Sequence, residues 1–296
     1  MPTRCGFVAV IGRPNVGKST LINAIMGKKI SIVTHKPQTT RHRILAVHTE
    51  GDTQIVFVDT PGIHRKAVKA MNQLMNRTAA NALADADLVL FIAEATHWTE
   101  EDDDVVYRFR STETPVIAVL NKVDRVHPKE RLLEAIAALS KRHEFAEIIP
   151  VSALKKDNLD ALMAVIPNFL PESPPLFPQE MQTDRSAEFQ AAEVIREKLT
   201  LMLHQEVPYG LTVQIERYES DDDRLTINAV IWVDRDSQKG IVVGKGGKVL
   251  KTVGQSARLE LREQLCCRVH LELWVKVKDN WSDSEQDLMR LGYELP

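Results

Sequence analysis

The fold is decided by Gly12-Arg13-Pro14-Asn15-Val16-Gly17-Lys18-Ser19, a stretch that matches the pattern G-x-x-x-x-G-K-[ST]. Its glycines let the backbone turn so that N–H groups point inward and form a cradle for phosphates. Lys18 brings a positive charge to the β- and γ-phosphates, and the Ser19 hydroxyl is placed to bind Mg²⁺. An apolar run at 7–11 predicts a buried strand before the loop, and 20–26 predicts a helix after it. The residues expected to bind the phosphates are Gly12, Asn15, Val16, Gly17, Lys18, Ser19 and Thr20.

A second motif, Asp59-Thr60-Pro61-Gly62, follows the apolar run 55–58. This spacing predicts that Asp59 lies at the end of a strand, facing the metal and the γ-phosphate. Gly62 is expected to offer its backbone N–H to the γ-phosphate. The carboxyl ends of parallel strands form the edge at which open α/β sheets bind ligands, so this motif is expected beside the first one.

Two further strand ends predict which base is bound. Asn121, Lys122 and Asp124 follow the run 116–120, and Ser152 and Ala153 follow 147–150. A carboxylate at Asp124 can accept from both N1–H and the 2-amino group of guanine. Adenine has neither donor and would leave the carboxylate unpaired, which carries a large penalty. The backbone N–H of Ala153 is expected to meet guanine O6. The residues expected to bind the base are Asn121, Lys122, Asp124, Ser152 and Ala153.

These four motifs, in this order, resemble those of the translation-factor-like GTPases, and more closely those of the Era family, over essentially the whole chain. Residues 33–43 resemble that family's first switch segment. Thr39 or Thr40 is expected to supply a second hydroxyl to Mg²⁺, and Thr40 is favoured. The alternative for this stretch is a polar surface loop. The resemblance implies a metal set of Ser19, Thr40 and Asp59 and a catalytic set of Lys18, Thr40 and Gly62.

Length and composition agree with a two-domain intracellular protein. The chain has 296 residues, 44% of them apolar, which gives ample core for about two domains. No apolar run approaches the ~18 residues that a membrane-spanning helix needs. Residues 1–4 lead straight into the first predicted strand, so no signal peptide is expected. The three cysteines, Cys5, Cys266 and Cys267, are interpreted as reduced and without a metal role.

The pattern divides the chain into three parts. Residues 1–166 alternate strands with helices, which predicts a mostly parallel sheet with helices on both faces. Predicted helices include 71–84 and 129–142, and the acidic run 100–104 is interpreted as a solvated first helical turn. Residues 167–183 contain five prolines and are expected to form a semi-rigid linker.

The remainder, 184–296, predicts an α+β domain. Helices are expected at 187–204, 237–243 and 248–264, strands at 211–218, 224–233 and 268–278, and a turn at 221–223. Their order, with Gly244-Lys245-Gly246-Gly247 between two helices, resembles the bacterial (type II) KH fold, whose G-x-x-G loop lets an RNA backbone approach closely. This part is acidic overall, with 16 basic and 20 acidic residues, but 237–259 has five basic residues and no acidic one. The alternative is a solvated helix face. The residues expected to bind RNA are Lys239, Gly244, Lys245, Gly246, Gly247, Lys248 and Lys251.

The resemblance implies a GTPase whose nucleotide state controls the binding of single-stranded RNA. Its implied partners are the 3′ end of the 16S ribosomal RNA and the small (30S) ribosomal subunit during assembly. The family resemblance further implies a monomer in the cytoplasm, and leaves open a peripheral contact with the cytoplasmic face of the inner membrane, although no amphipathic anchor is evident. Two alternatives stay open: a nucleotide-regulated RNA-binding switch with negligible hydrolysis, and a related GTPase with another partner.

Slow hydrolysis is expected. Ras-like enzymes place a glutamine after the second motif to orient the attacking water, but here that place is taken by Ile63, and His64 is the only titratable neighbour. In related GTPases with this replacement, an asparagine at the place of Asn15 helps to bind K⁺ beside the phosphates. K⁺ is therefore a second expected cation. The alternative is that Asn15 only braces the loop.

Overall fold

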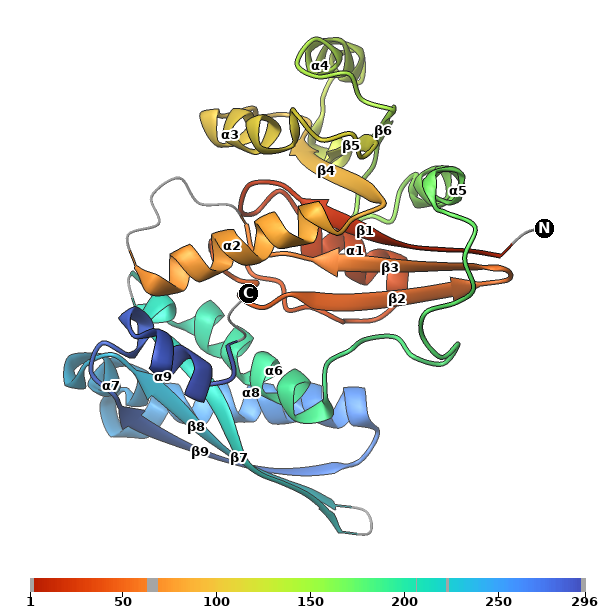
Figure 1. The fold of residues 1–296 in the computed structure, drawn as a ribbon. Helices are drawn as coiled ribbons and strands as arrows, with labels where there is room; N and C mark the ends of the chain where they lie inside the picture. The colour runs from red at the N-terminus through yellow and green to blue at the C-terminus, as the bar shows by residue number, and fades with distance from the viewer. Residues whose placement is uncertain (1–2, 63–68, 206, 222–223, 294–296) are drawn as a thin grey trace.

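Two β-sheets organise the chain in the computed structural model, which describes residues 3–62, 69–205, 207–221 and 224–293. The larger sheet has six strands and the smaller has three, and each lies in its own half of the molecule (Figure 1). The Pro-rich segment 167–183 joins the two halves. Among the described residues, we find no helix that combines the length and the apolar character needed to span a bilayer.

The six-stranded sheet has the order β2-β3-β1-β4-β5-β6. All neighbouring strands are parallel except β2 and β3. The central strands are covered on both faces, which explains their nearly continuous apolar sequences. The antiparallel edge strand β2, which directly follows the switch segment, was not predicted. The strands are β1 (Arg4–Ile11), β2 (Ile44–Glu50), β3 (Thr53–Asp59), β4 (Leu88–Glu94), β5 (Val116–Asn121) and β6 (Glu147–Pro150).

Helices pack on both faces of this sheet and contribute to its two larger apolar cores. Helices α1 (Lys18–Met26) and α5 (Leu159–Val165) contribute to one core. Helices α2 (Ala70–Ala84), α3 (Glu100–Phe109) and α4 (Arg131–Ser140) contribute to the other. The predicted helix 129–142 is shorter because i→i−3 bonds form a turn at its start. The short 3₁₀ helices in this half are η1 (Val123–Arg125) and η2 (Ile166–Phe169).

The acidic start of α3 agrees with its interpretation as a solvated turn at Glu100, Glu101 and Asp103, which are exposed, and differs from it at Asp102. Thr99 and Asp102 form a capping box there. Asp102 is fully buried. It accepts a hydrogen bond of 2.9 Å from the guanidinium of Arg13, which belongs to the phosphate loop, residues 12–19. Burial of a carboxylate requires such a partner. This turn therefore braces the phosphate loop.

The Pro-rich segment packs along the edge of the large sheet. Leu170 is buried in the core between α1 and α5. The Gln54 carboxamide accepts the backbone N–H groups of Leu176 and Phe177, each at 2.9 Å. Thr183 forms an isolated bridge with Ala46 of β2. The connection is therefore tied to the first half along its course.

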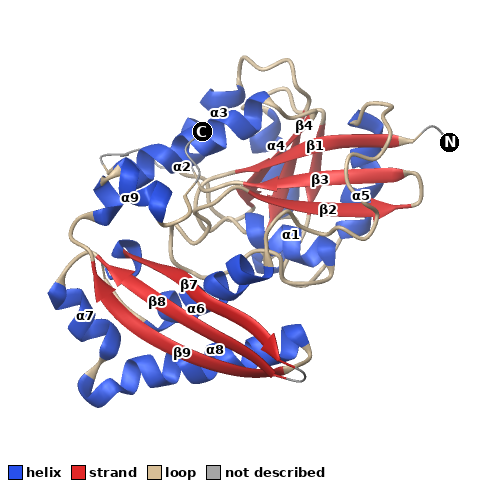
Figure 2. Ribbon diagram, turned by 60° about the horizontal axis from the view of Figure 1, so that its bottom comes forward, coloured by secondary structure: helices blue, strands red, loops and turns tan. Residues whose placement is uncertain are grey.

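The second half has the order α-β-β-α-α-β that was predicted. Strand β7 pairs antiparallel with β8, and β8 pairs parallel with β9. Helices α6 and α8 cover one face of this sheet and share its core (Figure 2). The predicted turn at 221–223 falls largely outside the described residues. The elements are α6 (Ala187–Met202), β7 (Leu211–Asp221), β8 (Arg224–Val233), α7 (Asp236–Val243), α8 (Lys248–Leu265) and β9 (Arg268–Val277), with 3₁₀ helices η3 (Val207–Gly210), η4 (Lys245–Gly247) and η5 (Trp281–Asp283).

An unpredicted helix, α9 (Glu285–Arg290), lies beside α2 and connects the two halves (Figures 1 and 2). Trp281 and Tyr293 share a buried apolar cluster with Met71 and Met75 of α2. The two halves are thus packed against each other through side chains near the end of the described chain.

Candidate functional site: a nucleotide cavity and a G-x-x-G groove

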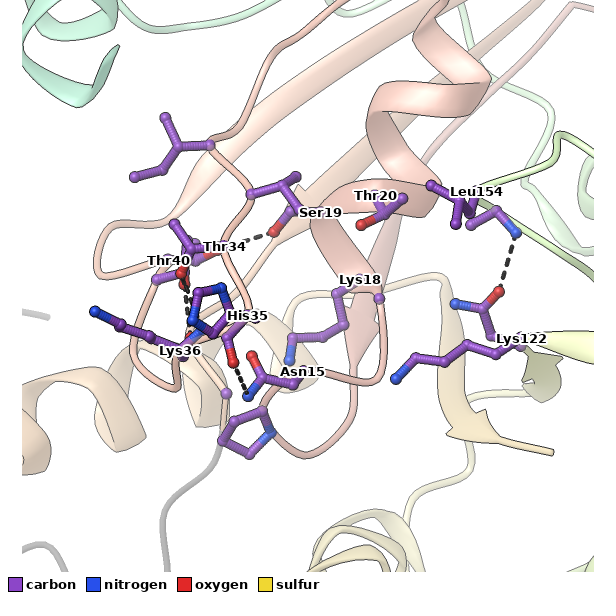
Figure 3. Close-up of a pocket in the computed structure, with 18 of the residues that line it drawn as sticks. Asn15, Lys18, Ser19, Thr20, Thr34, His35, Lys36, Thr40, Lys122 and Leu154 are labelled. Atoms are coloured by element: carbon purple, nitrogen blue, oxygen red, sulfur yellow. Dashed lines mark hydrogen bonds between the residues drawn. The ribbon is translucent and has the colours of Figure 1, made fainter. Parts of the chain in front are cut away.

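A cavity of about 440 Å³ opens at the carboxyl ends of β1 and β5, beside the start of α1 (Figure 3). Three segments form its walls. The phosphate loop forms its floor. The side that carries the base motifs is here called the guanine wall and consists of Asn121, Lys122, Asp124, Ser152 and Ala153. The opposite side is here called the switch wall and consists of residues 33–43.

The phosphate loop needs glycine at two positions. A Cβ at Gly17 would lie 2.3 Å from the Asn121 amide nitrogen, and one at Gly12 would lie 2.5 Å from the Ile92 carbonyl oxygen. Lys18 Nζ donates to the carbonyls of Gly12 and Arg13 at 2.9 and 3.0 Å. Burial lowers the pKa of Lys18 to about 8, although Asp59 opposes this effect. Two carbonyls of the phosphate loop therefore hold the Lys18 ammonium, which is expected to contact the phosphates.

The guanine wall is built by hydrogen bonds between its own members and the phosphate loop. The Asn121 amide donates to the Val16 carbonyl at 2.8 Å and accepts the Ala153 N–H at 3.0 Å. The Ala153 N–H, which was expected to meet guanine O6, thus already has an acceptor in this structure. Ser152 Oγ donates to Asp124 Oδ1 at 2.5 Å and is itself fully buried. Ser152 therefore orients the carboxylate that is expected to face the base.

Lys122 has positive φ and points along the cavity (Figure 3). Its ammonium lies 2.7 Å from Glu94 Oε2, and the Arg13 guanidinium lies 3.4 Å from the same oxygen. Burial raises the pKa of Glu94, but Lys122 and Arg13 outweigh it and leave that pKa lowered. Glu94 therefore links the guanine wall to the phosphate loop. Its position at the end of β4 carried no motif that could have revealed this.

Three oxygen ligands converge at the metal position proposed from the sequence. Ser19 Oγ lies 2.9 Å from both Thr40 Oγ1 and Asp59 Oδ2. Burial raises the pKa of Asp59, while Ser31 and Lys18 lower it in part. The second carboxylate oxygen, Oδ1, is buried without a hydrogen bond of normal geometry. Two hydroxyls and a carboxylate are ligands that Mg²⁺ prefers, and the unpartnered oxygen leaves ligand capacity, so the residues fit this ion.

The hydroxyl groups of Thr39 and Thr40, the two candidate ligands, have different partners in the structure. The Thr39 hydroxyl lies 2.6 Å from that of Thr34 and donates to the Lys36 carbonyl at 2.7 Å. Both contacts lie within the switch wall. Only Thr40 directs its hydroxyl toward Ser19 (Figure 3). The geometry therefore favours Thr40 as the second hydroxyl ligand.

A second candidate site lies beside α8. Gly244, Gly246 and Gly247 all have positive φ, and a Cβ at Gly244 would lie 2.4 Å from Val249 Cγ2. The space around Gly246 and Gly247 is open, so that a ligand backbone can approach them. A groove of about 430 Å³ runs from this loop and combines apolar with basic side chains. It is lined by Gly247, Leu250, Lys251, Gly254, Gln255, Arg258, Leu271 and Leu273.

Known families match both halves. A model described as a 50S ribosome-binding GTPase matches residues 7–122, and a KH domain model matches residues 206–282. GTPase Era of Vibrio parahaemolyticus is 47% identical over 98% of this chain and 91% of its own length. The Era of Marinobacter nauticus is 47% identical over 98% of this chain and 95% of its own. The chain belongs to the Era GTPase family.

Solved Era structures agree in fold over the whole chain. An Aquifex aeolicus Era variant bound to GDP·AlF₄⁻ superposes with a TM-score of 0.95 at 41% identity, covering 99% of this chain and 100% of the other. An Era in complex with MgGDPNP and nucleotides 1506–1542 of 16S ribosomal RNA gives the same TM-score, identity and coverage. The predicted family, and the predicted α/β GTPase domain followed by a type II KH domain, are confirmed.

The predicted nucleotide residues of this Era-family chain fall into two groups. Eleven of them line the cavity: Asn15, Gly17, Lys18, Ser19, Thr20, Thr40, Gly62, Asn121, Lys122, Asp124 and Ala153. Four lie behind its surface and support it: Gly12, Val16, Asp59 and Ser152. Ile63 and His64, on which the expectation of slow hydrolysis rests, lie outside the described residues.

Several lining residues had no sequence signal. Ile32, just before the switch wall, lines the cavity, and Leu154 stays 67% exposed at its rim. Of the residues expected to bind RNA, Gly247 and Lys251 line the G-x-x-G groove, whereas Gly244 and Gly246 do not. Lys239, Lys245 and Lys248 are exposed and lie outside its lining. The groove also contains Leu271 and Leu273, whose contribution depends on how β9 lies beside α8.

Proposed function

We propose that this chain binds and slowly hydrolyses GTP, and that it binds the single-stranded 3′ end of 16S ribosomal RNA during assembly of the small (30S) ribosomal subunit. The observation that carries this proposal is that a cavity lined by the four predicted nucleotide motifs and a G-x-x-G groove occur in one chain. The structural likeness to the Era complex with MgGDPNP and 16S nucleotides supports it.

In the proposed mechanism, Lys18 neutralises charge on the β- and γ-phosphates and the Gly62 N–H donates to the γ-phosphate. Ser19, Thr40 and Asp59 would hold Mg²⁺. The ion, when bound, neutralises the charge that develops on the phosphates. The Asp124 carboxylate, oriented by Ser152, accepts the two donors of guanine. Turnover is slow because the side chain at 63 has no group that can orient water.

We further propose K⁺ as a second cation. The Asn15 amide donates to the His35 carbonyl at 3.0 Å, which places this side chain at the point where the phosphate loop meets the switch wall. A cation there would stabilise charge in the transition state, as an arginine finger does. The same hydrogen bond also supports the alternative that Asn15 only braces the loop.

In the RNA part of the proposal, the open backbone at Gly246 and Gly247 accommodates the nucleic-acid backbone. Lys251 and Arg258 face its phosphates, and Leu250, Leu271 and Leu273 face the bases. A G-x-x-G loop clamps about four nucleotides, which suits a short single-stranded site. Lys239, Lys245, Lys248 and Gly244 are proposed to complete this site around its rim.

The proposed organisation is a GTPase domain at 1–166, a linker at 167–183 and a KH domain at 184–296. We propose that the protein acts as a cytoplasmic monomer. We also propose a peripheral contact of the protein with the cytoplasmic face of the inner membrane, which the family resemblance implies.

The nucleotide half of the proposal is tested by hydrolysis assays on purified protein. Slow release of phosphate from GTP should be lost in Lys18→Ala, which removes the charge beside the phosphates. Hydrolysis that survives this substitution would refute the assignment of the cavity.

The RNA half is tested by crosslinking the chain to total RNA and sequencing the attached fragments, which should include the 3′ end of 16S rRNA. The double variant Gly246→Asp/Gly247→Asp should abolish binding of that RNA in a filter assay, because it blocks the backbone approach and repels phosphate. Its GTP hydrolysis without RNA should persist. Lys248→Ala is a milder test. It should reduce the slope of log affinity against log salt concentration by the amount that about one phosphate contact contributes.

A further inference from the structure

The switch wall is covered by the second domain. Thr40 and Arg41 are 7% and 3% exposed, although the sequence left a surface loop open as an alternative. The Val33 N–H donates to Glu197 Oε1 of α6 at 3.0 Å, and Lys36 Nζ donates to the Leu203 carbonyl. The wall therefore lies between the nucleotide cavity on one side and helix α6 on the other.

Arg196 of α6 is the innermost of these contacts. It is 2% exposed, and its Nη2 donates to the carbonyl oxygen of Thr39. Glu193, one turn earlier on the same helix, accepts from Arg196 Nε and Nη2, each at 2.6 Å. Two parallel bonds of this kind fix the plane of a guanidinium. Arg196 is thus a rigid donor aimed at the peptide group that joins Thr39 to Thr40.

A second buried guanidinium holds the other side of Thr40. Arg41 Nη1 donates to the Leu211 carbonyl at 2.7 Å, and its Nη2 donates to the Pro208 carbonyl at 2.8 Å. Both acceptors belong to the second domain: Pro208 lies in η3 and Leu211 begins β7. Thr40 therefore lies between two anchors that both depend on the second domain, with its hydroxyl 2.9 Å from Ser19.

We propose that Arg196 is a positioning residue for GTP hydrolysis. By holding the Thr39 carbonyl, it fixes the peptide plane from which the Thr40 side chain reaches the metal position, and the KH domain thereby completes the active site of the GTPase domain. This inference rests on the proposed function, since it uses the role of Thr40 given there. Misplacement of a positioning group by about 1 Å can reduce a rate about 100-fold.

The test is Arg196→Met in the full-length protein, which keeps the length of the side chain and removes its donors. We expect kcat for GTP to fall about 10- to 100-fold while the affinity for GDP stays within about twofold. GDP does not require Thr40, so this split distinguishes positioning from a loss of fold. The Mg²⁺ concentration needed to bind the analogue GDPNP should rise, and that needed to bind GDP should not.

The matched control is Arg217→Met on β7. Arg217 forms a surface ion pair with Glu219 at 2.6 Å, and its side chain is 52% exposed. Its removal should leave kcat unchanged. If Arg196→Met does not fold, Glu193→Gln/Arg196→Met serves instead, because it leaves no buried charge unpaired.

A kcat within about twofold of wild type in either folded variant would overturn the inference, because the mechanism requires a displaced Thr40. Lys18→Ala keeps this result separate from the proposed function. Hydrolysis that survives Lys18→Ala refutes the nucleotide assignment itself. Hydrolysis that is lost in Lys18→Ala but intact in the Arg196 variants refutes only the positioning role.

Discussion

The guanine wall and the switch wall face the same cavity but are held by different parts of the chain. The guanine wall is closed by hydrogen bonds within the GTPase domain, such as those of Asn121 with Val16 and Ala153. The switch wall depends on α6 and on the start of β7, in the KH domain. The guanine wall is thus held within the GTPase domain, whereas the wall that carries Thr40 is also held by the KH domain.

The largest expected effect comes from breaking the guanine wall. Asp124→Asn replaces two acceptors by one acceptor and one donor, which suits the 2-oxo group of xanthine. GTP affinity should fall by about 2–4 kcal/mol, the cost of unpaired buried polar groups, while XTP affinity improves. Nucleotide titrations measure both. Because the switch wall is untouched, the variant should hydrolyse XTP at a kcat close to that of wild type for GTP; unchanged GTP binding would contradict the assignment.

Acid should weaken the switch wall selectively. His42 stacks on Tyr293 with ring centroids 4.4 Å apart and meets the edge of Phe189. Burial lowers its pKa from 6.5 to about 4, Glu193 opposes this effect, and Arg196 adds to it. The unfolded chain then binds more protons below pH 6.5, so this group's contribution to stability is lost as the pH falls toward 4. The other charged groups that face His42 are Arg185 and Arg41.

Between pH 7 and pH 5.5 this loss should be about 1 kcal/mol in the free energy of unfolding. Urea titrations at the two pH values measure it. His42→Phe keeps the aromatic contacts and should remove the part of the pH dependence that comes from His42. The comparison with wild type therefore distinguishes His42 from the other histidines. An equal pH dependence in His42→Phe and wild type would show that the imidazole is not responsible.

A smaller effect should follow from loosening the guanine wall without breaking it. Ser152→Ala removes the hydroxyl that holds Asp124 and should weaken the binding of GTP and GDP alike by about 1 kcal/mol, because both carry guanine. Ser140→Ala is the matched control, since its hydroxyl only donates to the Ala137 carbonyl on the exposed face of α4. Calorimetry with GDP compares the two. Equal affinities in both variants would mean that Asp124 is oriented without Ser152.

The smallest expected effect concerns the point where the phosphate loop meets the switch wall. K⁺ should accelerate GTP hydrolysis a few-fold over Na⁺ at equal ionic strength, through stabilisation of transition-state charge. Asn15→Ala should remove the difference. Equal wild-type rates in the two salts would leave Asn15 as a brace that holds the His35 carbonyl.

Much of the GTPase domain could be predicted because its signals are local. An apolar run followed by a glycine loop or a polar motif marks the ends of β1, β3, β5 and β6, and the carboxyl ends of parallel strands necessarily share one edge. Strand β8 has the predicted bounds, Arg224–Val233. The antiparallel strand β2 was missed because it stands at the sheet edge, after a polar segment. The short helix α9 was missed because its six residues give too little periodicity.

The sequence by itself determined the phosphate loop, the family and the two-domain order, since each depends on residues that are close together in the chain. Only the tertiary structure decided which hydroxyl of Thr39 and Thr40 faces Ser19. It also decided that Ser152 orients Asp124, and that α6 holds the switch wall. The contact of Arg41 with Leu211 joins residues 170 positions apart. No local pattern encodes such a pair, because it exists only when both domains are folded and packed together.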